Sequence, residues 1–305
     1  MAYTALIRRT NPSCFLFLID QSGSMKEILN PTNIRPAEEP FQTDGKTYTQ
    51  FGDGPTKAQL VADAINRLLQ TLCIKCAKDE EIRDYFSVGV IGYGGDNTAG
   101  RVEPAFSGLL AGRELVRISE IANNPSRIEE RMKKEPDGAG GLVEQKIKFP
   151  IWFDAVANGG TPMCQALRRA RSILEPWVIE CPDSYPPVVI NITDGESGDG
   201  DPTSDAAALK ALSTNDGSVL LFNAHISVNR TNAIQFPASE TGLPDQYAQM
   251  LFGMSSVLPP QIQLQAREDG LMVSELSRGF VFNAKMDHVI QLMDIGTSTQ
   301  LSNLR

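Results

Sequence analysis

Histidine is scarce in this 305-residue chain, which contains only His225 and His288. Neither adjoins a plausible nucleophile motif, so the sequence offers few groups for general acid–base catalysis. The only cysteine pair, Cys73-x-x-Cys76, falls inside a helical pattern and has no second pair or nearby histidine to complete a zinc site. We therefore interpret the five scattered cysteines as buried free thiols and expect no catalytic residues.

The chain also lacks an excess of positive charge. Its formal net charge is −9 and its pI is about 4.9. This argues against a nucleic-acid partner, which requires a basic surface, and against adhesion to an anionic membrane. No apolar run reaches the length of a membrane span, and the early run Cys14–Ile19 is too short for a secretory signal. Together with the free thiols, these absences predict a cytoplasmic protein.

What the sequence does contain is a regular alternation of short apolar runs with segments of helical periodicity. This alternation predicts an α/β fold in which helices cover both faces of a mostly parallel sheet. The expected strands are Phe15–Ile19, Phe86–Gly92, Val188–Thr193, Val219–His225 and Gly279–Phe282. The expected helices are Lys57–Cys76, Met163–Leu174, Asp205–Leu212, Asp269–Leu276 and Lys285–Met293.

Three long segments interrupt this alternation, at residues 26–56, 93–149 and 227–265. Structureless loops of this length are uncommon in compact domains, so we expect these insertions to carry small strands or helices. No internal repeat or linker is evident. This favours a single domain over residues 1–305, with a core from about 14 to 294.

The most informative stretch lies at the end of the first expected strand. There Asp20, Ser22 and Ser24 place a carboxylate and two hydroxyls at alternate positions where the strand meets a loop. Oxygen donors of this kind suit a hard divalent cation such as Mg²⁺. Thr161, in a glycine loop before a helix, and Asp194, just past another apolar strand, are the expected further ligands. In doubly wound sheets, the carboxyl ends of the strands form the ligand crevice.

Each of these segments has a plain structural interpretation when it is taken alone. Ser and Asp after a strand often cap turns or helices, Thr161 would serve as a helix N-cap, and Asp194-Gly195 would form a turn. Their occurrence together, in this order and behind apolar strands, favours a metal site instead. The acidic residues from Glu196 to Asp205 lack the order of a calcium-binding loop, and we interpret them as a solvated rim.

The five residues resemble the metal-ion-dependent adhesion site of von Willebrand factor A (VWA) domains. That site has Asp-x-Ser-x-Ser on a first loop, Thr on a second and Asp on a third, matched here by Asp20, Ser22, Ser24, Thr161 and Asp194. The Gly-Gly-Thr-Pro and Thr-Asp-Gly contexts are typical of intracellular bacterial members. The resemblance implies a Rossmann-like doubly wound sheet with one antiparallel edge strand. The long insertions, above all 26–56, depart from the family pattern.

The resemblance also implies a function. In the family the serines usually bind the metal directly, the aspartates often act through water, and one coordination position stays open. A metal short of anionic ligands attracts a foreign carboxylate. The expected role is therefore an adaptor or regulatory scaffold that captures an Asp or Glu of a protein partner through Mg²⁺, with Mn²⁺ or Ca²⁺ as alternatives. Bacterial relatives often work with AAA+ ATPases of the MoxR or chelatase type, or with kinases and phosphatases in stress and phage-defence gene clusters, which makes these the candidate partners.

One enzymatic alternative is a Mg²⁺-dependent phosphotransferase or phosphatase of the haloacid-dehalogenase type, which also places an Asp at the end of the first strand. That chemistry requires a second Asp two residues on, where this chain has Ser22. It also requires a charge-stabilising Lys, and none adjoins Thr161. The sequence therefore favours binding over catalysis.

Overall fold

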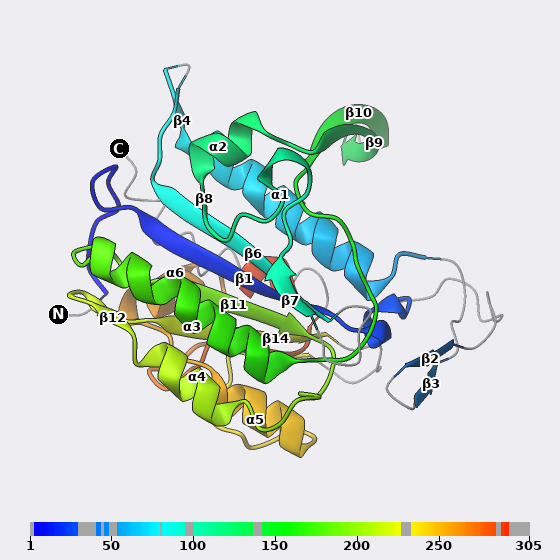
Figure 1. Cartoon of the computed structure of the whole chain (residues 1–305), viewed down its shortest axis with the longest axis vertical. Helices are drawn as coiled ribbons and strands as arrows, with labels where there is room; N and C mark the ends of the chain where they lie inside the picture. The colour runs from blue at the N-terminus through cyan, green and yellow to red at the C-terminus, as the bar shows by residue number, and fades with distance from the viewer. Residues whose placement is uncertain are drawn as a thin grey trace.

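A computed structural model describes residues 3–29, 41–43, 46–48, 54–79, 81–94, 101–136, 142–226, 233–284 and 288–292. At the centre of this described part lies an eight-stranded sheet with the order β15-β16-β14-β11-β1-β6-β7, in which β8 also pairs with β6 (Figure 1). The central strands are parallel to one another: β1 (Ser13–Gln21), β6 (Phe86–Gly94), β11 (Val188–Thr193), β14 (Leu220–Ile226) and β16 (Phe280–Ala284). The edge strands run antiparallel to their neighbours: β7 (Arg101–Pro104), β8 (Val116–Arg117) and β15 (Ile234–Gln235).

The central strand β1 is buried on both faces of the sheet. Phe15 and Phe17 contribute to the hydrophobic cluster on one face, and Leu16 and Leu18 to the cluster on the other. Successive side chains of a strand point to opposite faces, so a strand between two layers of helices must be apolar at nearly every position. The uninterrupted apolar run in the sequence reflects this double burial.

Helices cover both faces of the sheet. On the face of Phe15 and Phe17 lie α1 (Lys57–Cys76), α2 (Ile118–Asn123) and α6 (Pro260–Glu268). On the face of Leu16 and Leu18 lie α3 (Met163–Glu180), α4 (Thr203–Lys210) and α5 (Gln246–Met254), as Figure 1 shows for the α3–α5 layer. The expected α/β architecture with a mostly parallel sheet is confirmed, and its strand order is compatible with a Rossmann-like arrangement.

Most expected elements lie where the sequence predicts them. β11 and α1 have the predicted bounds, and the other central strands and α4 agree to within two residues at each end. The third helix, α3, continues past the predicted Leu174 to Glu180 although Pro176 lies inside it. Trp177 and Val178 are buried in the cluster on that face, and this packing stabilises the additional turns.

The helix predicted at Asp269–Leu276 is wrong. The helix in this region is α6, which precedes that segment and buries Ile262 and Ala266, four residues apart, on the sheet. Gly270 follows it with a φ of +82°, a conformation that commonly ends a helix. Of the helix predicted at Lys285–Met293, residues 288–292 are helical, and the rest of that prediction lies outside the described residues.

The long segments carry small elements, as predicted. Segment 93–149 contains the edge strands β7 and β8, helix α2, the short 3₁₀ helix η2 (Gly108–Leu110) and an antiparallel ribbon of β9 (Arg127–Pro136) and β10 (Leu142–Ile151). Segment 227–265 contains β15, α5 and the first part of α6. Within 26–56, β2 (Phe41–Thr43) pairs with β3 (Lys46–Tyr48).

The remaining described elements are minor. They are the 3₁₀ helix η1 (Gly23–Lys26) and two hairpins of two-residue strands, β4 (Ala77–Lys78) with β5 (Glu81–Ile82) and β12 (Ser213–Thr214) with β13 (Gly217–Ser218). None of the helices in the described ranges combines the length and the apolar character that crossing a membrane requires.

Candidate functional site

The strand order of the sheet reverses at β1. The chain places β6 on one side of β1 and later returns to place β11 on the other side. In open α/β sheets, ligands bind outside the carboxyl ends of the strands at such a reversal. Asp20 lies at the carboxyl end of β1 and Asp194 directly follows β11, so the two carboxylates share this sheet edge.

A chain of short hydrogen bonds joins the first loop to Asp194. Ser22 Oγ and Ser24 Oγ lie 3.0 Å apart, and Ser24 Oγ donates to Asp194 Oδ1 over 2.7 Å. The Asp20 carboxylate accepts from the Ser22 amide at 2.8 Å and from Thr193 Oγ1 at 2.6 Å. The structure thus brings together four of the five predicted site residues, although Ser24 and Asp194 are 170 residues apart in sequence.

The loop that contains Thr161 packs against the first loop through its backbone. The Gly23 amide donates to the Gly159 carbonyl at 2.9 Å. Thr161 is 9% exposed, and its carbonyl accepts from the Gly198 amide at 2.7 Å, in the loop that follows Asp194. The predicted fifth residue is therefore held between the two loops that carry the carboxylates. It is not the N-cap of α3, since that position belongs to Pro162.

Gly94, the last residue of β6, allows the first loop to approach the neighbouring strand. Its φ is +148°, and a Cβ there would lie 2.5 Å from the carbonyl carbon of Gln21 and 2.9 Å from the amide nitrogen of Ser22. A larger residue would displace this backbone. The position of Ser22 therefore depends on a glycine in another strand.

Lys57 is the residue that the sequence analysis missed. Its ammonium lies 2.7 Å from Asp194 Oδ2 and 2.6 Å from Glu27 Oε2, and its side chain is 4% exposed. Burial lowers the pKa of Lys57, but the attraction of Asp194 and Glu27 more than offsets this, so the pKa is raised overall and Lys57 is charged. One signal was present in the sequence: a Lys opens the helix predicted at 57, where the helix dipole disfavours a cation.

Asp20 is completely buried. This burial, followed by the repulsion of Asp194, raises the pKa of Asp20 to about 7, against the lowering effect of the bonds from Ser22 and Thr193. An ionised carboxylate without water around it requires a nearby positive charge. Lys57 supplies that charge to Asp194, whereas the hydrogen-bond donors to Asp20 are a neutral amide and a hydroxyl.

Two further titratable residues lie beneath the site. The Tyr93 hydroxyl donates to Asn191 Oδ1 at 2.8 Å, and burial raises the pKa of this fully buried phenol well above its usual value. His225 pairs with Thr193 across β11 and β14 and stacks on Phe282 with 4.8 Å between the ring centroids. Burial lowers the pKa of His225 to about 4, so this side chain is neutral near pH 7.

The donor atoms at this edge suit a hard cation. No group of three or more His, Cys, Asp or Glu side chains in the described ranges is arranged to hold a metal ion. The available set is instead two carboxylates, Asp20 and Asp194, with the hydroxyls of Ser22 and Ser24. Oxygen-only sets with few protein carboxylates fit Mg²⁺, which keeps several of its water ligands.

The chain was also compared with known proteins. A scan against protein-family models found no match, and a search of curated proteins found none either.

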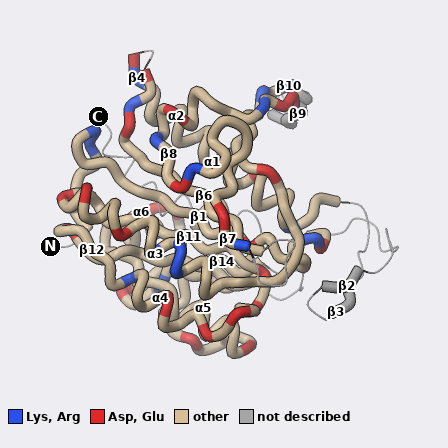
Figure 2. The backbone as a smooth tube through the Cα atoms, viewed as in Figure 1, with Lys and Arg blue, Asp and Glu red and all other residues tan. Residues whose placement is uncertain are grey.

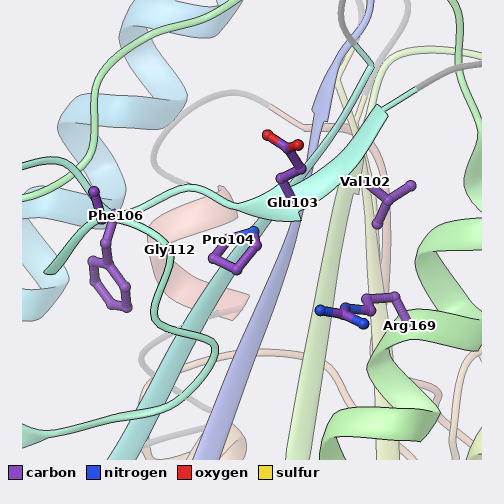
Figure 3. Close-up of a pocket in the computed structure, with 7 residues that line it drawn as sticks. Val102, Glu103, Pro104, Phe106, Gly112 and Arg169 are labelled. Carbon is purple, nitrogen blue, oxygen red and sulfur yellow. The ribbon is translucent and has the colours of Figure 1, made fainter.

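A pocket of about 640 Å³ lies beside the edge strand β7 (Figure 3). Arg169 reaches it from α3 and forms an ion pair with Glu114. The residues that line it are Val102, Glu103, Pro104, Phe106, Ala111, Gly112 and Arg169, and none of the five predicted site residues is among them. Figure 2 shows acidic and basic residues interspersed over the described elements. The pocket and the predicted site residues are therefore separate features.

Proposed function

We propose that this chain is a VWA-type, metal-dependent protein-binding module. Asp20, Ser22, Ser24, Thr161 and Asp194 would hold a divalent cation, Mg²⁺ with Mn²⁺ or Ca²⁺ as alternatives, at the carboxyl edge of a Rossmann-like doubly wound sheet. The cation would supply an open coordination position for an Asp or Glu of a partner protein. The role is an adaptor or regulatory scaffold in the cytoplasm, without an enzymatic activity of its own.

One observation carries this proposal. Hydrogen bonds connect Ser22 through Ser24 to Asp194, so two loops far apart in sequence form one oxygen-rich cluster beside the strand reversal. The complete burial of Asp20 adds to this, because a cation at the cluster would compensate its charge. The cysteines, which are all free, are consistent with a reducing compartment.

The candidate partners follow from the resemblance alone. They are a MoxR-type AAA+ ATPase, or a kinase or phosphatase of a stress or phage-defence system. We propose no nucleic-acid or membrane partner, because the formal net charge of −9 would repel both phosphate backbones and anionic lipids.

The structure supplies one observation in favour of the phosphotransferase alternative. No Lys adjoins Thr161 in sequence, but Lys57 lies 2.7 Å from an Asp194 oxygen, where a cation could stabilise phosphoryl charge. The second requirement is still unmet, because Ser22 stands where a second Asp would act as the acid–base group. Binding therefore remains the better proposal. Hydrolysis of a generic aryl phosphate that is lost in Asp20→Asn would establish the enzymatic alternative instead.

Titration calorimetry with MgCl₂ tests the proposal directly. We expect saturable binding by the wild type and a loss of at least about tenfold in affinity for Asp20→Asn, which removes one charge but keeps the shape of the side chain. A matched control is Asp216→Ala. Asp216 accepts hydrogen bonds from the Thr4 and Ala5 amides, outside the cluster, so its removal should leave Mg²⁺ affinity unchanged.

A pull-down from native lysate then tests capture of a partner. We expect the wild type to retain a partner in Mg²⁺ but not in EDTA, and Asp20→Asn to retain none. A wild type that binds no Mg²⁺ in the calorimeter would contradict the metal-site proposal. A wild type that binds Mg²⁺ but retains the same proteins with and without EDTA would contradict the capture of a partner through the metal.

A further inference from the structure

Lys57 occupies a position that local physics disfavours. It is the first residue of α1, where the partial positive charge of the helix dipole repels a cation. Its side chain is also almost completely removed from water. Two carboxylates compensate for this placement, Asp194 at 2.7 Å and Glu27 at 2.6 Å.

Several contacts fix Lys57 in this position. A capping box between Thr56 and Gln59 determines where α1 begins, and the Lys57 amide donates to the Glu27 carbonyl at 2.9 Å. Main chain and side chain of Lys57 are therefore both tied to the segment that follows the first loop. The start of α1 thus places the Lys57 ammonium within reach of both Asp194 and Glu27.

This ion pair changes what Asp194 can offer to a cation. Asp194 Oδ2 is held by the Lys57 ammonium and Oδ1 by the Ser24 hydroxyl, so each oxygen already accepts one short bond. The hydroxyls of Ser22 and Ser24 each keep lone pairs for a further contact. The arrangement favours direct binding through the hydroxyls and leaves the Asp194 carboxylate partly neutralised.

We propose that Lys57 is the built-in counter-charge of the metal site. This inference rests on the proposed function. With Asp20, Asp194 and Glu27 all ionised, as a bound cation would favour, these carboxylates and the Lys57 ammonium carry two net negative charges, which a divalent ion cancels. Without Lys57, the loaded site would remain net negative and would repel an incoming carboxylate. Lys57 thus weakens intrinsic metal affinity and in exchange allows the bound ion to accept an acidic group from outside. It is a positioning residue that sets ligand specificity.

The test compares Lys57→Met with the wild type by calorimetry with MgCl₂. Removing one positive charge near a divalent ion should tighten Mg²⁺ binding by about tenfold or more, even at the dielectric constant of water. Lys57→Arg keeps the charge and should bind Mg²⁺ as the wild type does. Lys210→Met is the matched control, because Lys210 donates to the Met254 carbonyl on another part of the fold. It should leave Mg²⁺ affinity unchanged.

Acetate is the probe for the carboxylate-accepting position. With Mn²⁺ in place of Mg²⁺, acetate should change the electron paramagnetic resonance spectrum of the wild type and of Lys57→Arg, but not that of Lys57→Met. An equal response of Lys57→Met and the wild type to acetate would overturn the inference.

Removing Lys57 leaves Asp194 without its ion-pair partner, so Lys57→Met is expected to melt at a lower temperature in EDTA and to recover in Mg²⁺.

If Lys57→Met does not fold even in Mg²⁺, Glu27→Gln is the variant that tests the inference. That variant removes one negative charge and should weaken Mg²⁺ binding by about tenfold. Unchanged affinity in Glu27→Gln, or affinity in Lys57→Met no tighter than in the wild type, would overturn the inference while leaving the metal site intact. A wild type that binds no Mg²⁺ would overturn the proposed function as well.

Discussion

At the scale of single residues, the sheet edge is governed by the need to compensate buried charge. Asp20, Asp194 and Lys57 all have side chains that are almost or completely removed from water. Lys57 and Asp194 compensate each other, whereas Asp20 relies on two neutral hydrogen-bond donors. Proteins retain such arrangements against their cost in stability mainly where function requires them. This is the residue-level reason to place the function here.

His225 yields a prediction about pH. Its pKa falls from 6.5 to about 4 on folding, mainly because of burial, with Asp194 and Asp245 opposing the shift and Lys57 adding to it. As pH falls from 6.5 towards 4, His225 therefore becomes protonated in the unfolded chain but stays neutral in the folded chain. Over this range the free energy of unfolding should lose about 3 kcal/mol through His225.

The matching experiment measures urea unfolding of wild type and His225→Gln between pH 7 and pH 4. We expect the variant to lose less stability across this range. Comparing the two proteins at each pH isolates the contribution of His225 to the free energy of unfolding. Asp20 contributes equally to both proteins, and its raised pKa makes stability increase, not decrease, as pH falls. Parallel curves for the two proteins would contradict the assignment.

At the scale of elements, the start of α1 positions the site. Thr56 Oγ1 accepts from the Gln59 amide at 3.2 Å, and Gln59 Oε1 accepts from the Thr56 amide at 2.8 Å. This capping box satisfies two amides that a helix start would otherwise leave unpaired. It also determines that Lys57 is the first helical residue and can reach Asp194.

Replacing the cap should destabilise the protein measurably. We expect Thr56→Ala to lower the free energy of unfolding by about 1 kcal/mol, as the loss of an N-cap side chain typically does. Thr71→Ala is the matched control, since Thr71 is partly buried within the same helix, away from its start, and donates to the Arg67 carbonyl. It should change stability by less than about 0.5 kcal/mol. Thermal unfolding followed by circular dichroism distinguishes the two, and equal effects would contradict the role of the cap.

At the scale of the whole molecule, the central sheet and its two helix layers form the framework, and the β9–β10 ribbon is an addition to it. The ribbon pairs over ten positions from Arg127 with Ile151 to Pro136 with Leu142. Near its base, Phe149 and Ile151 are buried, whereas Ile128 and Met132 are exposed. Ile128 and Met132 therefore contribute little to the hydrophobic core that supports the framework.

Shortening the ribbon should leave the framework intact. Met132 and Lys146 lie opposite each other, so residues 133–145 can be replaced by Asn-Gly, a favoured two-residue hairpin turn. We expect the variant to keep the Mg²⁺ affinity of the wild type and to change its melting temperature by only a few degrees. Calorimetry and thermal unfolding check this. Loss of Mg²⁺ binding would show that the outer ribbon supports the site.

The sequence by itself determined the elements whose cause is local. An uninterrupted apolar run predicted β1, and helical periodicity predicted α1 with the bounds that the structure shows. It also marked Asp20, Ser22, Ser24, Thr161 and Asp194, because loop residues behind strand ends carry chemistry in such folds. The helix predicted at Asp269–Leu276 failed because the apolar spacing that the sheet buries, Ile262 and Ala266, lies earlier in the chain.

Only the tertiary structure decided what these residues contact. Lys57 and Asp194 are 137 residues apart, and no local pattern specifies that their charges meet within 2.7 Å. That contact arises because β1 and β11 are neighbours in the sheet and α1 begins beside their carboxyl ends. Because both side chains are removed from water, each charge is stabilised by the other. The sequence thus indicated the residues of the proposed cation site, and the fold added the positive charge of Lys57 beside them.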